Sequence, residues 1–266
     1  MKKIKRCSKR WLPMLLLSML MAVLFGMSAL AEGTIVDMKS EGNGIYSYSQ
    51  TTGSNTGDVY HKITVPYSGD VIITGNAITS LGTTYSMRVV LCNTKGKELT
   101  NAVYVDTDRE KAVLYGVKKG TYYIKTTENR YYALVAKIEK RTDKGGVKKS
   151  KATTIKHKKQ MTGVMPAGEK SSAADWYKIK MPKNKKLELS ISQEGSGAFQ
   201  FYLYGPSYKK GIRIDTLENE SGKYTSINAL TRKASKIKGG TYYIKVCRPS
   251  YAKKASGIYT IKWRVK

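Results

Sequence analysis

The stretch KKGTYYIK at residues 118–125 returns as KGGTYYIK at residues 238–245, 120 positions further along (238 − 118 = 120). Seven of the eight residues match. Each copy reads as a glycine-containing turn followed by a strand, because glycine tolerates turn backbone while Tyr and Ile suit a pleated surface. A repeat on this scale in a chain of 266 residues predicts two copies of one domain.

Short strands with alternating side chains surround the repeat. Residues 187–192 (LELSIS) and 258–265 (IYTIKWRV) alternate between apolar and polar side chains, which predicts half-buried strands with Leu189 and Ile261 among the inward residues. Gly, Asn and Ser interrupt such segments at regular spacing, and no comparable stretch after residue 31 has the apolar period of a helix. The pattern predicts an all-β fold of two tandem antiparallel β-sandwiches.

The N-terminus has the features of an export signal. Six basic residues precede an apolar run from Trp11 to Leu30, which closes on the small-x-small pattern that ends at Ala31. We predict a signal peptide at residues 1–31, cleavage after Ala31 and a secreted, extracellular protein with no transmembrane segment left after cleavage. The alternative is an uncleaved membrane anchor, because the run is nearly long enough to span a bilayer.

The predicted organisation is a signal peptide at 1–31, a first β-sandwich at 32–140, a polar linker at 141–149 and a second β-sandwich at 150–266. The first sandwich holds 13 basic and 11 acidic residues, whereas the second holds 25 basic and 7 acidic residues, a net charge of +18. A field of that sign favours anionic partners and is screened by salt.

Several motifs of the second copy carry a family resemblance: AADWYKI at 173–179, FYLY at 201–204, GTYYIKV at 240–246 and SGIYTI at 256–261. With these motifs, residues 150–266 resemble the bacterial pre-peptidase C-terminal (PPC) domain family. The first copy resembles the same family through Asp58-Val59-Tyr60 and its own GTYYI.

The resemblance implies two tandem PPC domains, each a jelly-roll-like β-sandwich of the kind that accompanies secreted hydrolases or serves as a binding and stability module. Some members of the family bind calcium through clustered acidic residues. The seven acidic residues of the second copy form no obvious cluster, so we predict no metal site there.

The sequence contains few groups suited to catalysis. Only His61 and His157 follow the signal, and the counterpart of His61 in the second copy is predicted to be a lysine. A histidine in a strand is typical of a surface or edge position. We find no Gly-x-Ser-x-Gly, His-Glu-x-x-His or phosphate-binding motif, so we predict a protein that is not an enzyme and has no catalytic residues. Cys92 and Cys247 leave two alternatives open: a disulfide, which export permits, or a thiol nucleophile beside a histidine.

Two further acidic features have structural interpretations. Residues 106–110 (DTDRE) place acidic oxygens at alternate positions, which suits calcium, but they lack the glycine and distal glutamate of the helix–loop–helix calcium motif. A solvated loop is favoured, so we predict no cofactor, with calcium as the alternative. Asp58 and Asp175 open matching strands, where we expect each to hydrogen-bond local backbone.

The basic residues of the second copy support a more specific hypothesis. If its strands share a sheet, alternation collects basic and aromatic side chains on one outer face, opposite Ile179, Ile244 and Ile261. The predicted ligand-binding residues are Trp176, Lys178, Lys180, Tyr243, Lys245, Lys262 and Arg264. Such a face suits teichoic acid, an anionic polysaccharide, an acidic glycan or a membrane surface. The alternative is a solvated face that keeps the protein soluble.

We therefore predict a secreted, non-catalytic binding module at the bacterial cell surface, in contact with an anionic polymer (cell wall or glycan). The alternative is an accessory or structural protein that docks on a separate exported protein such as a hydrolase. Nucleic acid suits the charge, but an exported protein meets little of it, so we predict no nucleic-acid partner.

Overall fold

The all-β fold predicted from the sequence is confirmed. The computed structural model describes residues 33–50, 57–78, 82, 84–106, 108–127, 131–219, 225–229 and 237–265. The predicted signal peptide at 1–31 lies outside the described residues. Among the residues that are described, no helix is long and apolar enough to cross a membrane.

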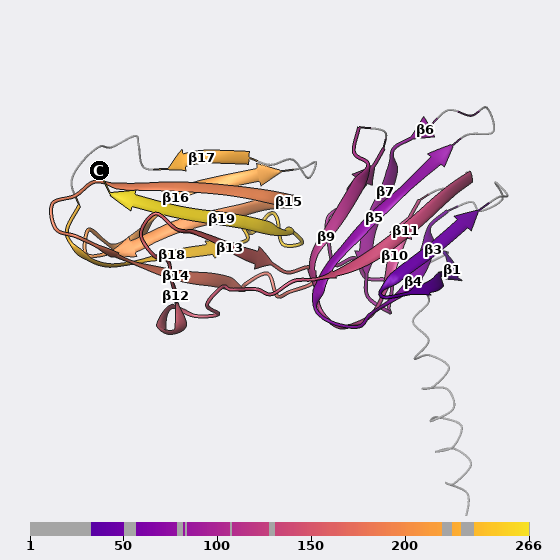
Figure 1. Ribbon diagram of the computed structural model, residues 1–266, viewed down its shortest axis with the longest axis horizontal. Coiled ribbons are helices and arrows are strands. Elements are labelled where there is room, and N and C mark those ends of the chain that lie inside the picture. Colours follow the sequence, from indigo (N-terminus) through magenta and orange to yellow (C-terminus); the bar gives the residue numbers. More distant parts are fainter. Residues whose placement is uncertain are drawn as a thin grey trace, which may run out of the picture. The chain divides into compact units, whose positions relative to one another are not determined.

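The first sandwich is made of the eleven strands β1 to β11 (Figure 1). They are β1 (Thr34–Asp37), β2 (Lys39–Gly42), β3 (Ile45–Gln50), β4 (Val59–Val65), β5 (Gly69–Ile78), β6 (Thr84–Tyr85), β7 (Met87–Cys92), β8 (Val103–Val105), β9 (Lys111–Val117), β10 (Gly120–Thr126) and β11 (Tyr131–Lys140). One sheet has the order β1-β4-β10-β7-β8 and the other the order β2-β3-β11-β5-β6, with β9 also pairing β5. The pairs are antiparallel except for β1 with β4.

The second sandwich is made of the short 3₁₀ helix η1 and the strands β12 to β19. They are η1 (Lys149–Lys151), β12 (Thr153–Thr154), β13 (Gln160–Met165), β14 (Ala174–Met181), β15 (Leu187–Gly205), β16 (Tyr208–Asn219), β17 (Thr225–Ala229), β18 (Gly240–Cys247) and β19 (Ser256–Val265). The strand order is β12-β14-β18-β15-β19-β13, and β16 and β17 also pair with β15.

The strand β15 belongs to both layers of this sandwich. Residues 187–196 pair with β19, and residues 200–204 pair with β18 (Figure 1). The change of partner falls at Gly195 and Gly197, whose φ angles of 140° and 87° are readily adopted only by glycine. One layer is therefore β12-β14-β18 with the C-terminal half of β15, and the other is β13-β19 with its N-terminal half.

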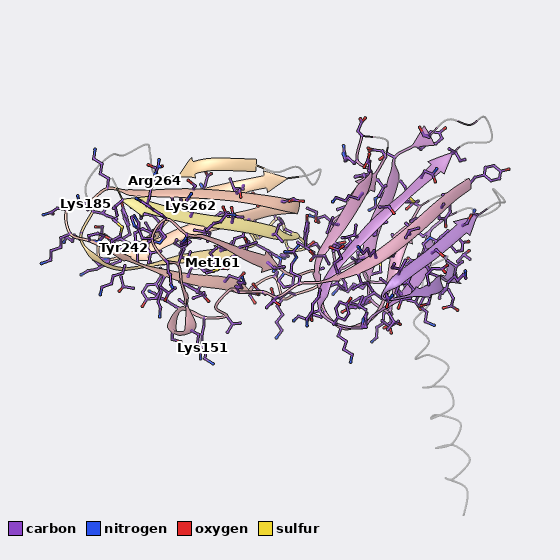
Figure 2. The ribbon with its side chains drawn as sticks, in the orientation of Figure 1. Lys151, Met161, Lys185, Tyr242, Lys262 and Arg264 are labelled. Atoms are coloured by element: carbon purple, nitrogen blue, oxygen red, sulfur yellow. The ribbon has the colours of Figure 1, made fainter. Side chains whose placement is uncertain are left out.

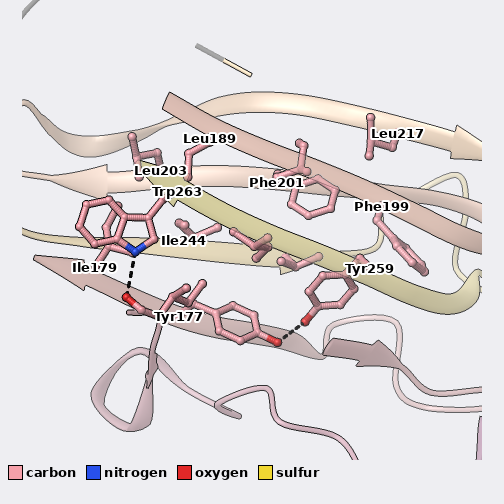
Figure 3. Close-up of a cluster of buried hydrophobic side chains, with 14 of the residues drawn as sticks. Tyr177, Ile179, Leu189, Phe199, Phe201, Leu203, Leu217, Ile244, Tyr259 and Trp263 are labelled. Carbon is pink, nitrogen blue, oxygen red and sulfur yellow. Dashed lines mark hydrogen bonds between the residues drawn. The ribbon is translucent and has the colours of Figure 1, made fainter. Parts of the chain in front are cut away.

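Inward side chains from both layers form the core of the second sandwich. The Trp263 indole donates to the Ile155 carbonyl (2.9 Å), and the hydroxyls of Tyr177 and Tyr259 lie 2.8 Å apart, as Figure 3 shows. Tyr259 also donates to the carboxylate of Asp175, which is only 8% exposed. The expectation that Asp175 bonds local backbone is wrong, because its carboxylate points into the sandwich.

The first sandwich repeats this cross-layer pair with one residue exchanged. His61 on β4 lies 3.0 Å (Nε2 to Oη) from Tyr132 on β11, where the second sandwich has Tyr177 and Tyr259. The strand registers show that His61 and Tyr177 are equivalent. His61 pairs with Ile124 on β10, Tyr177 pairs with Ile244 on β18, and these two isoleucines occupy the same position of the repeat. The predicted lysine counterpart and surface position of His61 are therefore wrong: the imidazole is completely buried.

The space around the Tyr177–Tyr259 pair predicts a destabilising substitution. Gly163 lies opposite Tyr259, and a Cβ there would overlap both hydroxyl oxygens. We expect Gly163→Ala to lower the free energy of unfolding by about 2 kcal/mol, because overpacking forces the rings apart. Thr162→Ala, one residue earlier on β13, is the control, and equal midpoints for the two variants in urea denaturation would contradict the expectation.

From Gly33 onward the chain forms one compact unit that contains both sandwiches. Two clusters of buried apolar side chains lie within it, one mainly from residues 38–138 and one from residues 155–263. The domain boundaries at 140 and 150 stay a prediction.

Candidate functional site

The layer β14-β18-β15 presents a mixed aromatic and basic surface to solvent. On β14, Tyr177 and Ile179 are buried and point into the core. Trp176 and Lys178, which alternate with them, are half-buried and point to the opposite face of the sheet. Pairing extends this alternation across the sheet. Trp176 lies opposite Lys245 and Lys245 opposite Tyr202, whereas Lys178 lies opposite Tyr243 and Tyr243 opposite Tyr204. With Lys149, we call these side chains the aromatic–lysine face: Lys149, Trp176, Lys178, Tyr202, Tyr204, Tyr243 and Lys245.

The rings of this face contact one another and its ammonium groups. The centroids of Trp176 and Tyr204 lie 5.5 Å apart at 39°. The Lys245 Nζ lies 5.9 Å from the Trp176 ring centroid and 6.0 Å from that of Tyr202. The Lys149 Nζ lies 4.9 Å from the centroid of Tyr243 and 5.2 Å from that of Tyr204. These are cation–π distances, so each ammonium is attracted to two rings.

Lys149 reaches the face because the segment before η1 is bound along β14. The Gly146 amide donates to the Trp176 carbonyl (3.3 Å), and the Trp176 amide donates back to the Gly146 carbonyl (2.8 Å). A side chain at Gly146 would overlap the Lys151 carbonyl oxygen. This part of the predicted linker therefore contributes a residue to the face, which the sequence reasoning missed. The Gly145-Gly146 pair, which permits close approach of two backbones, is the signal that could have found it.

The equivalent lysines of the two sandwiches differ in whether a carboxylate pairs with them. Lys125 in the first sandwich stands where Lys245 stands in the second, and its Nζ lies 3.0 Å from the Asp58 carboxylate and 3.1 Å from that of Glu98. The expectation that Asp58 bonds local backbone is therefore wrong as well, because its carboxylate accepts from the side chains of Lys125 and Thr127. Within the described parts of the chain, no Asp or Glu forms a salt bridge with Lys149, Lys178, Lys180 or Lys245. No described carboxylate therefore compensates the charge of these ammonium groups.

The structure separates the seven predicted site residues into two groups. Trp176, Lys178, Lys180, Tyr243 and Lys245 share one outward face. Lys262 and Arg264 lie on β19 in the other layer (Figure 2), and Arg264 forms an ion pair with Glu188. The prediction of a single platform is wrong for these two residues, because β15 changes layers and keeps β19 away from β18.

The described residues offer little for nucleophilic or metal chemistry. Cys92 and Cys247 are free and buried, so the disulfide alternative is wrong. Burial raises the pKa of Cys92 to about 11 and also raises the pKa of Cys247, which disfavours the thiolate. Asp106 accepts hydrogen bonds from the amides of Asp108 and Arg109 and so caps its own loop. Within the described ranges, no three His, Cys, Asp or Glu side chains cluster as metal ligands would.

Comparisons with known proteins add solved structures of low similarity. No protein-family model matches the chain, and no curated protein does. The pre-peptidase C-terminal domain of a collagenase from Bacillus anthracis is 17% identical, with a TM-score of 0.31 over 47% of this chain and 100% of that one. A periplasmic inhibitor of g-type lysozyme from Salmonella Typhimurium, PliG, is 17% identical, with a TM-score of 0.28 over 43% and 98%.

A third structure spans more of the chain. The tandem CBM22-1–CBM22-2 domain of Paenibacillus barcinonensis Xyn10C is 10% identical, with a TM-score of 0.25 over 84% of this chain and 86% of that one. At such TM-scores these similarities transfer no function.

Proposed function

We propose that the chain is an exported, non-catalytic binding module made of two tandem PPC-like sandwiches. Its aromatic–lysine face would bind an anionic polymer, such as a cell-wall polymer or an anionic glycan, at the bacterial cell surface. One observation carries the proposal: four aromatic rings and three ammonium groups share one sheet face, and no described carboxylate pairs with them.

The two kinds of side chain suit the two parts of such a ligand. The faces of Trp176 and the three tyrosines are flat, apolar surfaces against which the C–H groups of a sugar ring can pack. The ammonium groups attract carboxylate or phosphate groups along the polymer. Because strands of a sheet lie about 4.8 Å apart, charged and aromatic contacts alternate at short, fixed spacing. An extended polymer would therefore make several weak contacts at once.

The test is a binding series with the chain from residue 32 to 266 on immobilised teichoic acid and on polygalacturonate, across increasing salt. We expect retention that falls steeply as salt rises, because the charged contacts are screened. Trp176→Ala is expected to weaken retention about tenfold, as for a central aromatic contact.

The chain offers a matched control in Lys262, an exposed lysine on the opposite layer. Lys245→Ala is expected to weaken retention about fivefold, and Lys262→Ala to leave it unchanged. Equal losses of retention for both variants would show that retention depends on net charge and not on this face. No retention at low salt would overturn the proposal and favour the alternative, docking on a separate exported protein.

A further inference from the structure

We infer that Lys149 and Lys245 make the aromatic–lysine face selective for saccharides that carry negative charge, because they hold neutral saccharides off its rings. The inference rests on the proposed function and specifies the ligand class of the same site. It follows from the positions of the two ammonium groups over the rings.

All four rings of the face lie within reach of an ammonium. Lys245 stands on the central strand β18, between Trp176 on β14 and Tyr202 on β15. Lys149 is held by η1 and the Gly146 bridge above Tyr204 and Tyr243. Each ring is half-buried in the sheet, so only its outward side is open to a ligand. The Lys149 and Lys245 ammonium groups lie over the faces of these rings, where a sugar ring would stack.

A saccharide that stacks on these rings must displace the ammonium groups. A neutral saccharide offers them hydroxyl oxygens but no negative charge, and no carboxylate among the described residues lies within salt-bridge distance of them. Stacking then costs the cation–π attraction and gives no charge interaction in return. An anionic saccharide presents its own carboxylate or phosphate to the displaced ammonium. The aromatic face therefore becomes accessible for stacking while the ammonium gains an oppositely charged partner.

The first sandwich lacks this arrangement. Lys125, the counterpart of Lys245, is held by Asp58 and Glu98, and its side chain is only 13% exposed. The nearby rings of Tyr60 and Tyr123 pack edge to face on one another, 5.9 Å between centroids. Selectivity of this kind therefore belongs to the second sandwich.

The experiment replaces each lysine with methionine, which keeps an apolar stem of similar reach and removes the charge. Wild type, Lys149→Met and Lys245→Met would be titrated with three probes: a neutral glucan, polygalacturonate with its carboxylates, and poly(glycerol phosphate) with its phosphodiesters. We expect wild type to bind the polyanions tightly and the glucan only weakly. Each variant is expected to lose about fivefold on the polyanions and to gain glucan binding by about the same factor.

Lys262→Met on the opposite layer is the matched control and should change neither affinity. If wild type binds polyanions but neither variant gains glucan binding, the inference is overturned while the proposed function stands. Glucan binding by wild type as tight as polyanion binding would overturn the inference as well. If wild type binds no polyanion at low salt, the proposed function fails. The tighter of the two polyanions identifies carboxylate or phosphodiester as the preferred anion.

Discussion

Asp175→Asn is expected to remove most of the pH dependence of stability from the second sandwich. Burial, reinforced by the charge of Asp143, raises the pKa of Asp175 to about 7. The folded state therefore binds the proton more tightly than the unfolded state does, where the carboxyl has its ordinary pKa of 3.8. The stabilisation is complete below pH 4 and is lost as the pH rises through 7, a loss of about 4 kcal/mol.

Urea denaturation followed by tryptophan fluorescence would measure this directly. Trp176 and Trp263 are the only tryptophans after residue 31, and both belong to the second sandwich. Between pH 4 and 8 we expect a falling free energy of unfolding for wild type and a nearly flat profile for the variant, which keeps an oxygen to accept from Tyr259. Asp215→Asn on β16 is the control. Parallel profiles for wild type and Asp175→Asn would contradict the assignment.

His61→Gln is expected to have the opposite pH signature, in the first sandwich. Burial lowers the pKa of His61 to about 3, against an ordinary value of 6.5. The neutral imidazole is favoured in the folded state, so its stabilisation is complete above pH 6.5 and is lost as the pH falls toward 3. At pH 4 the loss amounts to about 3 kcal/mol.

Hydrogen exchange at the amides of β4 and β11, across a urea series at pH 4, 5 and 7, would report on this sandwich, whose described residues contain no tryptophan. Wild type should lose protection on acidification, and His61→Gln should not. His157→Gln serves as the control, because His157 is exposed and its replacement removes the same kind of group without burial. A variant that keeps the acid sensitivity of wild type would rule out His61 as its source.

Local alternation predicted much of the fold. The inward placement of Leu189 and Ile261 is confirmed, since both are fully or almost fully buried. The repeated GTYYIK strand also brought Tyr243 and Lys245 next to Trp176 and Lys178, as predicted for one shared face. These are properties of single strands and their direct neighbours, which a period of two residues encodes.

The missed features depend on contacts between segments distant in sequence. Alternation at residues 187–192 predicts one short strand, whereas Gly195 and Gly197 let that strand continue to Gly205 with new partners. Lys149 lies in a polar, glycine-containing segment that reads as linker, and only its bridge to β14 brings it to the face. Neither feature produces a periodic pattern of apolar residues, so local alternation could not predict it.

The continuity of β15 also bears on how the second sandwich opens. Because 19 consecutive residues form one strand that pairs with β16 and β18 at one end and with β17 and β19 at the other, neither layer can detach without breaking the same element. In a sandwich whose two sheets are joined only by loops, the sheets can separate while each stays intact. The second sandwich differs, because β15 is part of both layers. Its layers should therefore melt as a single cooperative unit, with the amides of β15 exchanging only through global unfolding.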